Sequence, residues 1–156
     1  QIQMHIKDYG VLKIELNEAV APKTVANLLK LVNEKFYDGL SFHRIIPGFI
    51  IQGGCPLGSG TGGPGYHIEG EFSSNGFENP LKHTKGVISM ARSGNPNSAG
   101  SQFFIMHEAS PHLDGQYAAF GHVIEGLDII DTIAHVKTGF QDKPIDKVVI
   151  EQVTQL

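Results

Sequence analysis

Residues 42–54 read FHRIIPGFIIQGG, a stretch in which apolar and polar residues alternate around a Pro47-Gly48 turn. Alternation at period two on both sides of a turn predicts two short antiparallel strands. These strands carry Arg44 and Gln52 into a largely hydrophobic setting. A guanidinium keeps its charge, so its burial requires partners for its five donors. We expect either a site for an apolar, carbonyl-rich ligand or a structural arginine that fixes the turn.

Length and composition restrict the class of protein. The chain has 156 residues, 40 % of them hydrophobic and 18 % charged, which is typical of one globular domain. A formal charge of −4 and the lack of any Lys or Arg cluster argue against nucleic acid as a main partner. No apolar run reaches the length of a membrane span, and no signal-peptide pattern is present. We therefore expect a cytoplasmic monomer without membrane contact.

Turn residues divide the rest of the chain into short segments. Besides the two strands above, apolar patterns predict strands at residues 2–7, 11–16, 86–91, 101–106, 118–124 and 148–153. Apolar residues at helical spacing predict helices at residues 22–36 and 127–136. Because closure removes exposed sheet edges, we expect a mainly β fold, a closed eight-stranded antiparallel barrel with a helix over each open end. A mixed α+β sandwich is the alternative.

Several familiar motifs lack their structural context. Residues 58–63, GSGTGG, match G-x-G-x-x-G, but Pro-Gly follows instead of a helix, so nucleotide binding is not expected. His107 and His112 are five residues apart with a proline between them, which argues against a zinc site. Ser101 lacks the G-x-S-x-G turn of a hydrolase. We expect no metal and no cofactor, and we interpret His43 as a hydrogen-bonded structural residue.

The segments that remain carry a family resemblance. FHRIIPGFIIQGG, GTGGPG, ISMA, GSQFFIM and HLDGQYAAFG occur in this order along the chain. Together they resemble the signature blocks of cyclophilins, the peptidyl-prolyl cis–trans isomerases, and the CPLGSGTGGPGY stretch is most similar to the small bacterial members. The resemblance extends over essentially the whole chain and implies a single cyclophilin-like domain over residues 1–156.

The resemblance also implies a site. It assigns catalysis to Arg44, Phe49 and Gln52. It assigns substrate binding to nine further residues: Ile50, Gly60, Ala91, Arg92, Gln102, Phe104, His112, Leu113 and Tyr117. Three of these depart from the family pattern, since Arg92 stands where Asn is usual, His112 where many members have Trp, and Tyr117 where many have His. A His offers less apolar area than a Trp, so weaker cyclosporin binding is expected.

The chemistry of such a site follows from the amide bond. Rotation about an X–Pro bond is opposed by roughly 18–20 kcal/mol because the nitrogen lone pair is conjugated with the carbonyl. In the twisted state the nitrogen regains this lone pair, and a charged donor aimed at it lowers the barrier. We expect Arg44 to be that donor, with Phe49, Phe104 and Leu113 holding the proline ring.

The leading hypothesis is thus an isomerase that acts on proline-containing peptides and unfolded proteins and assists folding. The alternative is a non-catalytic proline-peptide binding module on the same fold, and retention of Arg44, Phe49, Gln52 and Phe104 favours the enzyme. A third hypothesis, a small-ligand-binding barrel, requires an open apolar lumen, whereas the bulky strand residues favour a filled core. Arg92 is either a solvated rim residue or a contact to substrate carbonyls or acidic side chains before the proline.

Overall fold

The first hairpin sets the pattern of the sheet. In the computed structural model, which describes residues 1–156, strand β1 (Ile2–Ile6) pairs with β2 (Gly10–Leu16) in antiparallel register. Asp8 and Gly10 in the connecting turn have φ values of 68° and 129°. Both lie in the left-handed region that aspartate tolerates and glycine adopts freely. The predicted hairpin is therefore confirmed.

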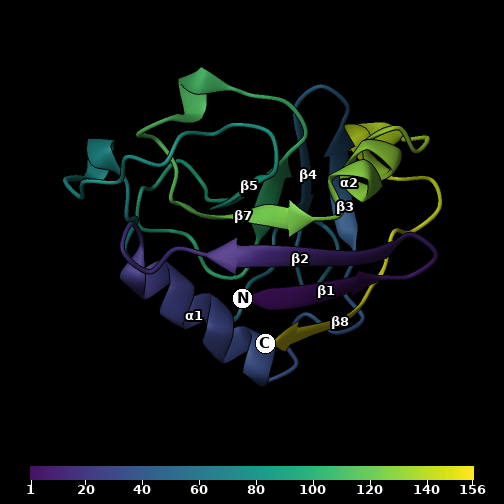
Figure 1. The fold of residues 1–156 in the computed structure, drawn as a ribbon, viewed down its shortest axis with the longest axis horizontal. Coiled ribbons are helices and arrows are strands. Elements are labelled where there is room, and N and C mark those ends of the chain that lie inside the picture. Colours follow the sequence, from purple (N-terminus) through teal and green to yellow (C-terminus); the bar gives the residue numbers. More distant parts are fainter.

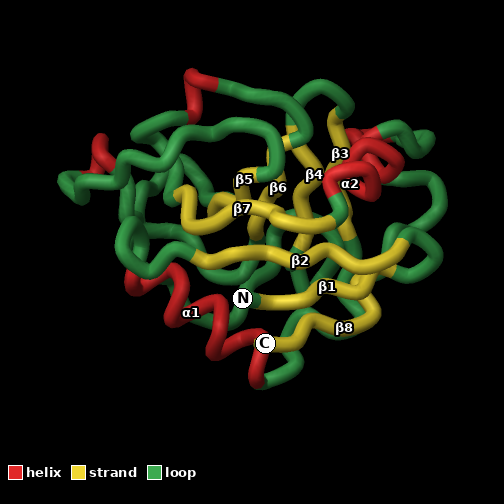
Figure 2. Tube along the Cα trace, viewed as in Figure 1, coloured by secondary structure: helices red, strands yellow, loops and turns green.

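The remaining six predicted strands are also present, with ends shifted by one or two residues. They are β3 (Phe42–Ile46), β4 (Ile50–Gly53), β5 (Val87–Met90), β6 (Phe103–Met106), β7 (Ala119–Glu125) and β8 (Ile150–Gln155). All eight strands form one antiparallel sheet in the order β3-β4-β6-β5-β7-β2-β1-β8. Figure 1 and Figure 2 show how this sheet curls around the interior of the molecule.

The prediction of a closed barrel is wrong, because the edge strands β3 and β8 do not form a ladder. They meet only where they begin, through one isolated bridge between Ser41 and Val149 and three backbone hydrogen bonds. These bonds run from Gly39 N to Ile150 O, from Ile150 N to Leu40 O and from Phe42 N to Val148 O, at 2.7, 2.7 and 2.9 Å. The register of β3 shifts between Phe42 and Arg44. Such a bulge bends a strand, and with no ladder between β3 and β8 the sheet remains an open, half-closed barrel.

Two helices lie at opposite ends of the curled sheet (Figure 1). Helix α1 (Pro22–Asn33) starts with the proline that suits a first turn and packs against β8. It ends before the predicted residue 36, because Lys35 adopts a left-handed φ of 61°. Helix α2 (Leu127–Ala134) buries Ile130 and Ile133 against β2, β3 and β4. Neither helix is both long and apolar enough to cross a membrane.

The strands that fill the core also position the site. Ile45, Ile51, Ile105 and Ile88 lie side by side across β3, β4, β6 and β5, and each is 0 % exposed. They belong to one cluster of 29 buried hydrophobic residues, so side chains fill the interior as expected. Because successive side chains on a strand point to opposite faces, the neighbouring row of residues faces outward.

Candidate active site

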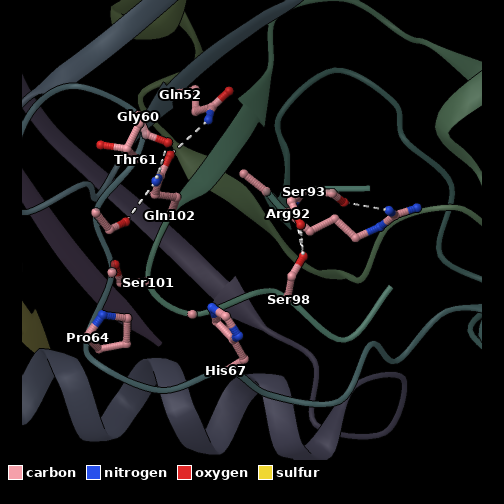
Figure 3. Close-up of a pocket in the computed structure, with 14 residues that line it drawn as sticks. Gln52, Gly60, Thr61, Pro64, His67, Arg92, Ser93, Ser98, Ser101 and Gln102 are labelled. Carbon is pink, nitrogen blue, oxygen red and sulfur yellow. Dashed lines mark hydrogen bonds between the residues drawn. The ribbon is translucent and has the colours of Figure 1, made fainter. Parts of the chain in front are cut away.

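The outward-facing row carries a chain of polar contacts. Arg44 on β3 pairs with Gln52 on β4, and the Arg44 Nη1 donates a hydrogen bond of 3.3 Å to the Gln52 Oε1. The Gln52 Nε2 donates to the Gln102 Oε1 at 3.2 Å. The Gln102 Nε2 donates in turn to the carbonyl oxygens of Gly60 and Gly62, at 3.0 and 2.9 Å (Figure 3). Four predicted site residues are thus linked from the sheet to the glycine-rich loop.

A small cavity of about 130 Å³ opens beside Arg44. We call it the proline pocket, after the ring that the sequence analysis expects it to hold. Its nine lining residues are Arg44, Phe49, Ile50, Gln52, Ala91, Arg92, Phe104, Leu113 and Tyr117, all of them predicted from the sequence. A second apolar cluster, separate from the main core, includes Ile50, Phe104 and Leu113 and supplies the floor. The structure therefore combines two guanidinium groups, those of Arg44 and Arg92, with an apolar pocket.

Aromatic contacts shape the walls of this pocket. The rings of Phe104 and Tyr117 meet edge to face, with centroids 5.6 Å apart at 83°. His112 stacks on Phe49 at 6.0 Å and 25°, but it is exposed and does not line the cavity. His112 therefore extends the outer side of the Phe49 wall.

Arg92 is held more firmly than either prediction for it assumed. Its Nε and Nη2 donate to the Gln116 carbonyl at 3.1 and 2.7 Å, and its Nη1 donates to the Ser93 carbonyl at 2.9 Å. The guanidinium also lies over the rings of Phe72 and Tyr117, 4.9 and 4.6 Å from their centroids. Arg92 thus braces the rim of the pocket instead of projecting freely into solvent.

Sequence reasoning missed a buried network behind Phe104, which we call the His83 brace. The ring of His83 stacks on Phe104 at 6.0 Å and 21°. Its Nδ1 lies 3.0 Å from the Asp114 Oδ1, and its Nε2 lies 2.9 Å from the Ser89 Oγ. A carboxylate only accepts hydrogen bonds, so Nδ1 donates to Asp114 and Nε2 accepts from the Ser89 hydroxyl. Since Asp114 directly follows Leu113, the brace fixes two walls of the pocket.

This brace has the composition of a hydrolase triad but not its accessibility. Ser89 is 0 % exposed and lines none of the cavities described here, so no substrate reaches its hydroxyl. Burial lowers the pKa of His83, although the hydrogen bond to Asp114 acts in the opposite direction. We therefore treat His83 as a neutral hydrogen-bonding group.

A second His–Asp pair holds the wall that carries Phe49. The His107 Nδ1 accepts a hydrogen bond of 2.8 Å from Gly48 N, which leaves Nε2–H to donate to the Asp131 Oδ1 at 3.0 Å. The backbone N of His107 also donates to Phe49 O at 2.8 Å. Asp131 is shared with Lys85, whose Nζ lies 2.8 Å away. The paired residues lie 31 and 24 positions apart in the sequence, so no local motif predicts either pair.

The interpretation of His43 as a hydrogen-bonded residue is wrong. His43 is 7 % exposed, and its Nδ1 is buried without a hydrogen-bond partner. Burial lowers the pKa of His43, and the positive charges of Arg44 and Lys143 lower it further. His43 is therefore expected to be a neutral imidazole next to Arg44 on β3.

A wider cavity of about 340 Å³ adjoins the proline pocket (Figure 3). We call it the glycine-loop cavity, because the loop of residues 60–64 forms one wall. The opposite wall comes from residues 91–93 and 98–102, and His67 lies at the edge. Gln52, Ala91 and Arg92 line both cavities, so the two are continuous.

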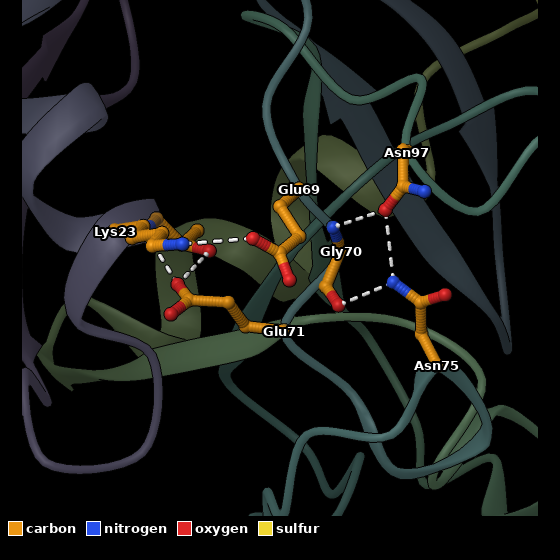
Figure 4. Close-up of polar contacts among 7 residues, drawn as sticks. Lys23, Glu69, Gly70, Glu71, Asn75 and Asn97 are labelled. Atoms are coloured by element: carbon orange, nitrogen blue, oxygen red, sulfur yellow. Dashed lines mark hydrogen bonds and ion pairs between the residues drawn. The ribbon is translucent and has the colours of Figure 1, made fainter.

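Contacts with helix α1 anchor the loops around this cavity (Figure 4). The buried Glu71 Oε1 accepts hydrogen bonds from Thr24 N and Oγ1, at 2.6 and 2.8 Å, near the start of the helix. A carboxylate is favourable there because it satisfies free N–H groups and faces the positive end of the helix dipole. Lys23 pairs with Glu69 at 2.7 Å nearby, an exposed contact of little energetic weight.

Gly70 ties the same segment to the 93–100 loop. Its N donates to the Asn97 Oδ1 at 3.1 Å, and its O accepts from the Asn75 Nδ2 at 2.8 Å (Figure 4). A Cβ at this position would lie 2.3 Å from the Pro96 carbonyl oxygen. Only glycine permits this approach, which holds the far wall of the glycine-loop cavity in place.

Comparisons with known proteins agree with this architecture. The family model described as cyclophilin type peptidyl-prolyl cis-trans isomerase matches residues 1–155. Peptidyl-prolyl cis-trans isomerase B of Bacillus subtilis is 50 % identical over 130 residues, which cover 83 % of this chain and 87 % of the relative. A peptidyl-prolyl cis-trans isomerase of Synechococcus elongatus is 53 % identical over 112 residues, 72 % of each chain.

Solved structures show the same fold. A cyclophilin-type peptidyl-prolyl cis-trans isomerase of Cryptosporidium parvum, crystallised in the presence of the dipeptide Ala-Pro, superposes with a TM-score of 0.89. It is 36 % identical, and the match covers 97 % of this chain and 96 % of that one.

Proposed function

Since this chain belongs to the family of cyclophilin-type peptidyl-prolyl cis-trans isomerases, we propose that Arg44 is the residue that lowers the barrier to rotation. The protein is an isomerase of X–Pro peptide bonds, and the reaction breaks no covalent bond. Catalysis then requires only groups that favour the twisted amide over both planar forms.

Arg44 is suited to this role by its setting. One of its N–H groups is engaged by Gln52, which fixes the guanidinium at the mouth of the proline pocket and leaves other donors for the substrate. A donor aimed at the pyramidal prolyl nitrogen binds the twisted state more strongly than the planar ground state. The apolar neighbours reduce screening by water and strengthen this contact.

The other predicted residues hold the substrate around the rotating bond. Phe49, Phe104 and Leu113 enclose the proline ring, which is favourable because apolar surface leaves water. Gln52 and Gln102 lie where the proline pocket meets the glycine-loop cavity, and they bind the chain on one side of the proline. With the ring immobilised and this side fixed, rotation is confined to the bond between them.

The observation that carries this assignment is the Arg44 guanidinium, which Gln52 holds on the wall of a mostly apolar pocket of about 130 Å³. Exchange NMR on an Ala-Pro-Phe peptide tests it, with the native protein and Arg44→Ala in parallel. Loss of such a donor is expected to slow exchange by roughly 10²–10³-fold. A folded Arg44→Ala variant that loses less than fivefold removes Arg44 from the mechanism. A native protein that binds the peptide without accelerating exchange is a recognition module.

The substrates we propose are proline-containing peptides and unfolded chains, so that the enzyme assists folding. The Ala-Pro dipeptide named with the Cryptosporidium parvum relative supports the peptide class. We also propose that cyclosporin binds more weakly than in relatives with Trp, because His112 offers less apolar area beside Phe49. Calorimetric titration tests this, and a nanomolar affinity contradicts it. The cytoplasmic location and the monomeric state stay predictions.

A further inference from the structure

A third and larger cavity of about 860 Å³ also borders Arg44. We call it the outer groove. Arg44 and Gln52 line both the outer groove and the proline pocket, and Gly60 lines both the outer groove and the glycine-loop cavity. The far wall of the outer groove is the loop of residues 139–145, none of which belongs to the site predicted from the sequence. A peptide leaving the proline pocket can therefore enter the groove without crossing a barrier of protein.

The 139–145 loop is an ordered, hydrogen-bonded unit. Gly139 N donates to Lys143 O at 2.8 Å, and Ile145 N donates to Lys137 O at 3.0 Å. The short 3₁₀ helix η3 (Phe140–Asp142) forms its tip and packs against β3, the strand that carries Arg44. The loop thus presents its side chains from a defined position next to the reacting group.

Its backbone is held in an uncommon conformation. Gln141 and Asp142 have φ values of 57° and 59°, in the left-handed region that non-glycine residues rarely occupy. Non-glycine residues with this backbone conformation are enriched at sites that contact ligands. The loop therefore has a shape that local chain preference alone does not favour.

Two large apolar side chains of this loop are exposed at the groove. Phe140 is 86 % exposed and Ile145 is 67 % exposed, and they are the two hydrophobic residues that line the groove. The other lining residues are polar, charged, glycine or proline, including His43, Arg44 and Gln52. Exposed apolar side chains next to a polar floor are typical of a surface that binds a partner.

We propose that the outer groove is a substrate subsite that binds an aromatic or branched apolar side chain within three residues of the proline. The bound segment is the flank opposite to the one in the glycine-loop cavity. Phe140 and Ile145 contact its side chain, and Arg44 and Gln52 offer donors to its backbone carbonyls. A peptide matches this lining because it presents carbonyl oxygens and an apolar side chain together. The inference rests on the proposed function and specifies its preferred substrates.

Exchange NMR on two peptides tests this subsite. The short peptide is capped Ala-Pro, and the long peptide extends it by three residues on each side with Phe two residues from the proline. Phe140→Ala combined with Ile145→Ser is expected to lower kcat/KM for the long peptide by roughly three- to tenfold, as for a lost aromatic contact. The short peptide is expected to be unaffected.

Leu57→Ala is the matched control, because Leu57 is 72 % exposed, apolar and outside all three cavities. Leu57→Ala should leave kcat/KM for both peptides unchanged. If the double variant lowers kcat/KM equally for both peptides, or for neither, the proposal of a substrate subsite in the outer groove is wrong. Failure of the proposed function gives a different result, because Arg44→Ala would then leave kcat/KM for both peptides unchanged. Backbone amide shifts at residues 139–145 upon addition of the long peptide only provide a second readout.

Discussion

The proline pocket and the cavities beside it are built by different means. The pocket measures about 130 Å³, has mostly apolar walls, and is backed by two His–Asp pairs whose histidines are buried. The glycine-loop cavity and the outer groove measure about 340 and 860 Å³ and are walled by loops rich in glycine and polar residues. The comparison indicates that fixed geometry is concentrated where the proposed function places the rotating bond. The cavities on either side are wider and are formed by loops.

The largest effect on the fixed part of the site is expected when the His83 brace is removed, and it is measured as a loss of stability. His83→Ala leaves the buried Ser89 hydroxyl without its partner, which costs about 1–3 kcal/mol, and removes the ring that stacks on Phe104, while Asp114 keeps the hydrogen bond from the backbone N of residue 83. We expect a loss of roughly 2–4 kcal/mol in the free energy of unfolding, measured by urea denaturation. The matched control is His67→Ala at the exposed edge of the glycine-loop cavity, which should change stability by less than about 0.5 kcal/mol. If both variants lose the same free energy of unfolding, the buried brace is no more important for stability than the exposed edge of the cavity, contrary to this prediction.

A smaller effect on the free energy of unfolding is expected from lowering the pH. The pKa values of His43 and His83 are lowered in the folded protein, whereas both residues titrate near 6.5 when unfolded. Between these values the unfolded chain binds more protons, so stability is complete above about pH 6.5 and decreases as the pH falls below it. The slope is at most about 1.4 kcal/mol per pH unit for each histidine. Urea midpoints at pH 7.5 and 5.5 measure this, and His43→Asn should reduce the difference; a native protein equally stable at both values refutes it.

The smallest effect is expected from Arg92→Asn, which tests the rim between the pocket and the flank. Three of the five Arg92 N–H donors bind the carbonyls of Gln116 and Ser93, which fixes the guanidinium at the rim and keeps it from reorienting toward an acidic substrate residue. A series of peptides with Glu, Ala or Lys before proline should therefore keep its order of kcat/KM within about twofold in the variant. A clear loss of preference for Glu would instead favour a direct substrate contact.

Much of the pocket was accessible from sequence because its residues lie on patterned strands. The alternation around Pro47-Gly48 predicted β3 and β4, and the family resemblance supplied all nine residues that line the proline pocket. The brace was not accessible, since His83 and Asp114 are brought together only by the tertiary fold. The closed barrel was predicted wrongly because β3 and β8 meet only where they begin, a detail of strand pairing that sequence patterning does not reveal.

The alternation of core and site residues along β3 and β4 restricts how this protein can change over evolutionary time. Ile45 and Ile51 face the interior while Arg44 and Gln52 face outward, one position away. Insertion or deletion of one residue in either strand would exchange the two sets, placing a guanidinium in the core and isoleucines at the surface. Changes in length are therefore tolerable only in the loops, around residues 55–66, 91–100 and 137–147. We expect relatives with new substrate ranges to differ there by insertions and deletions, and to differ in the strands by substitution alone.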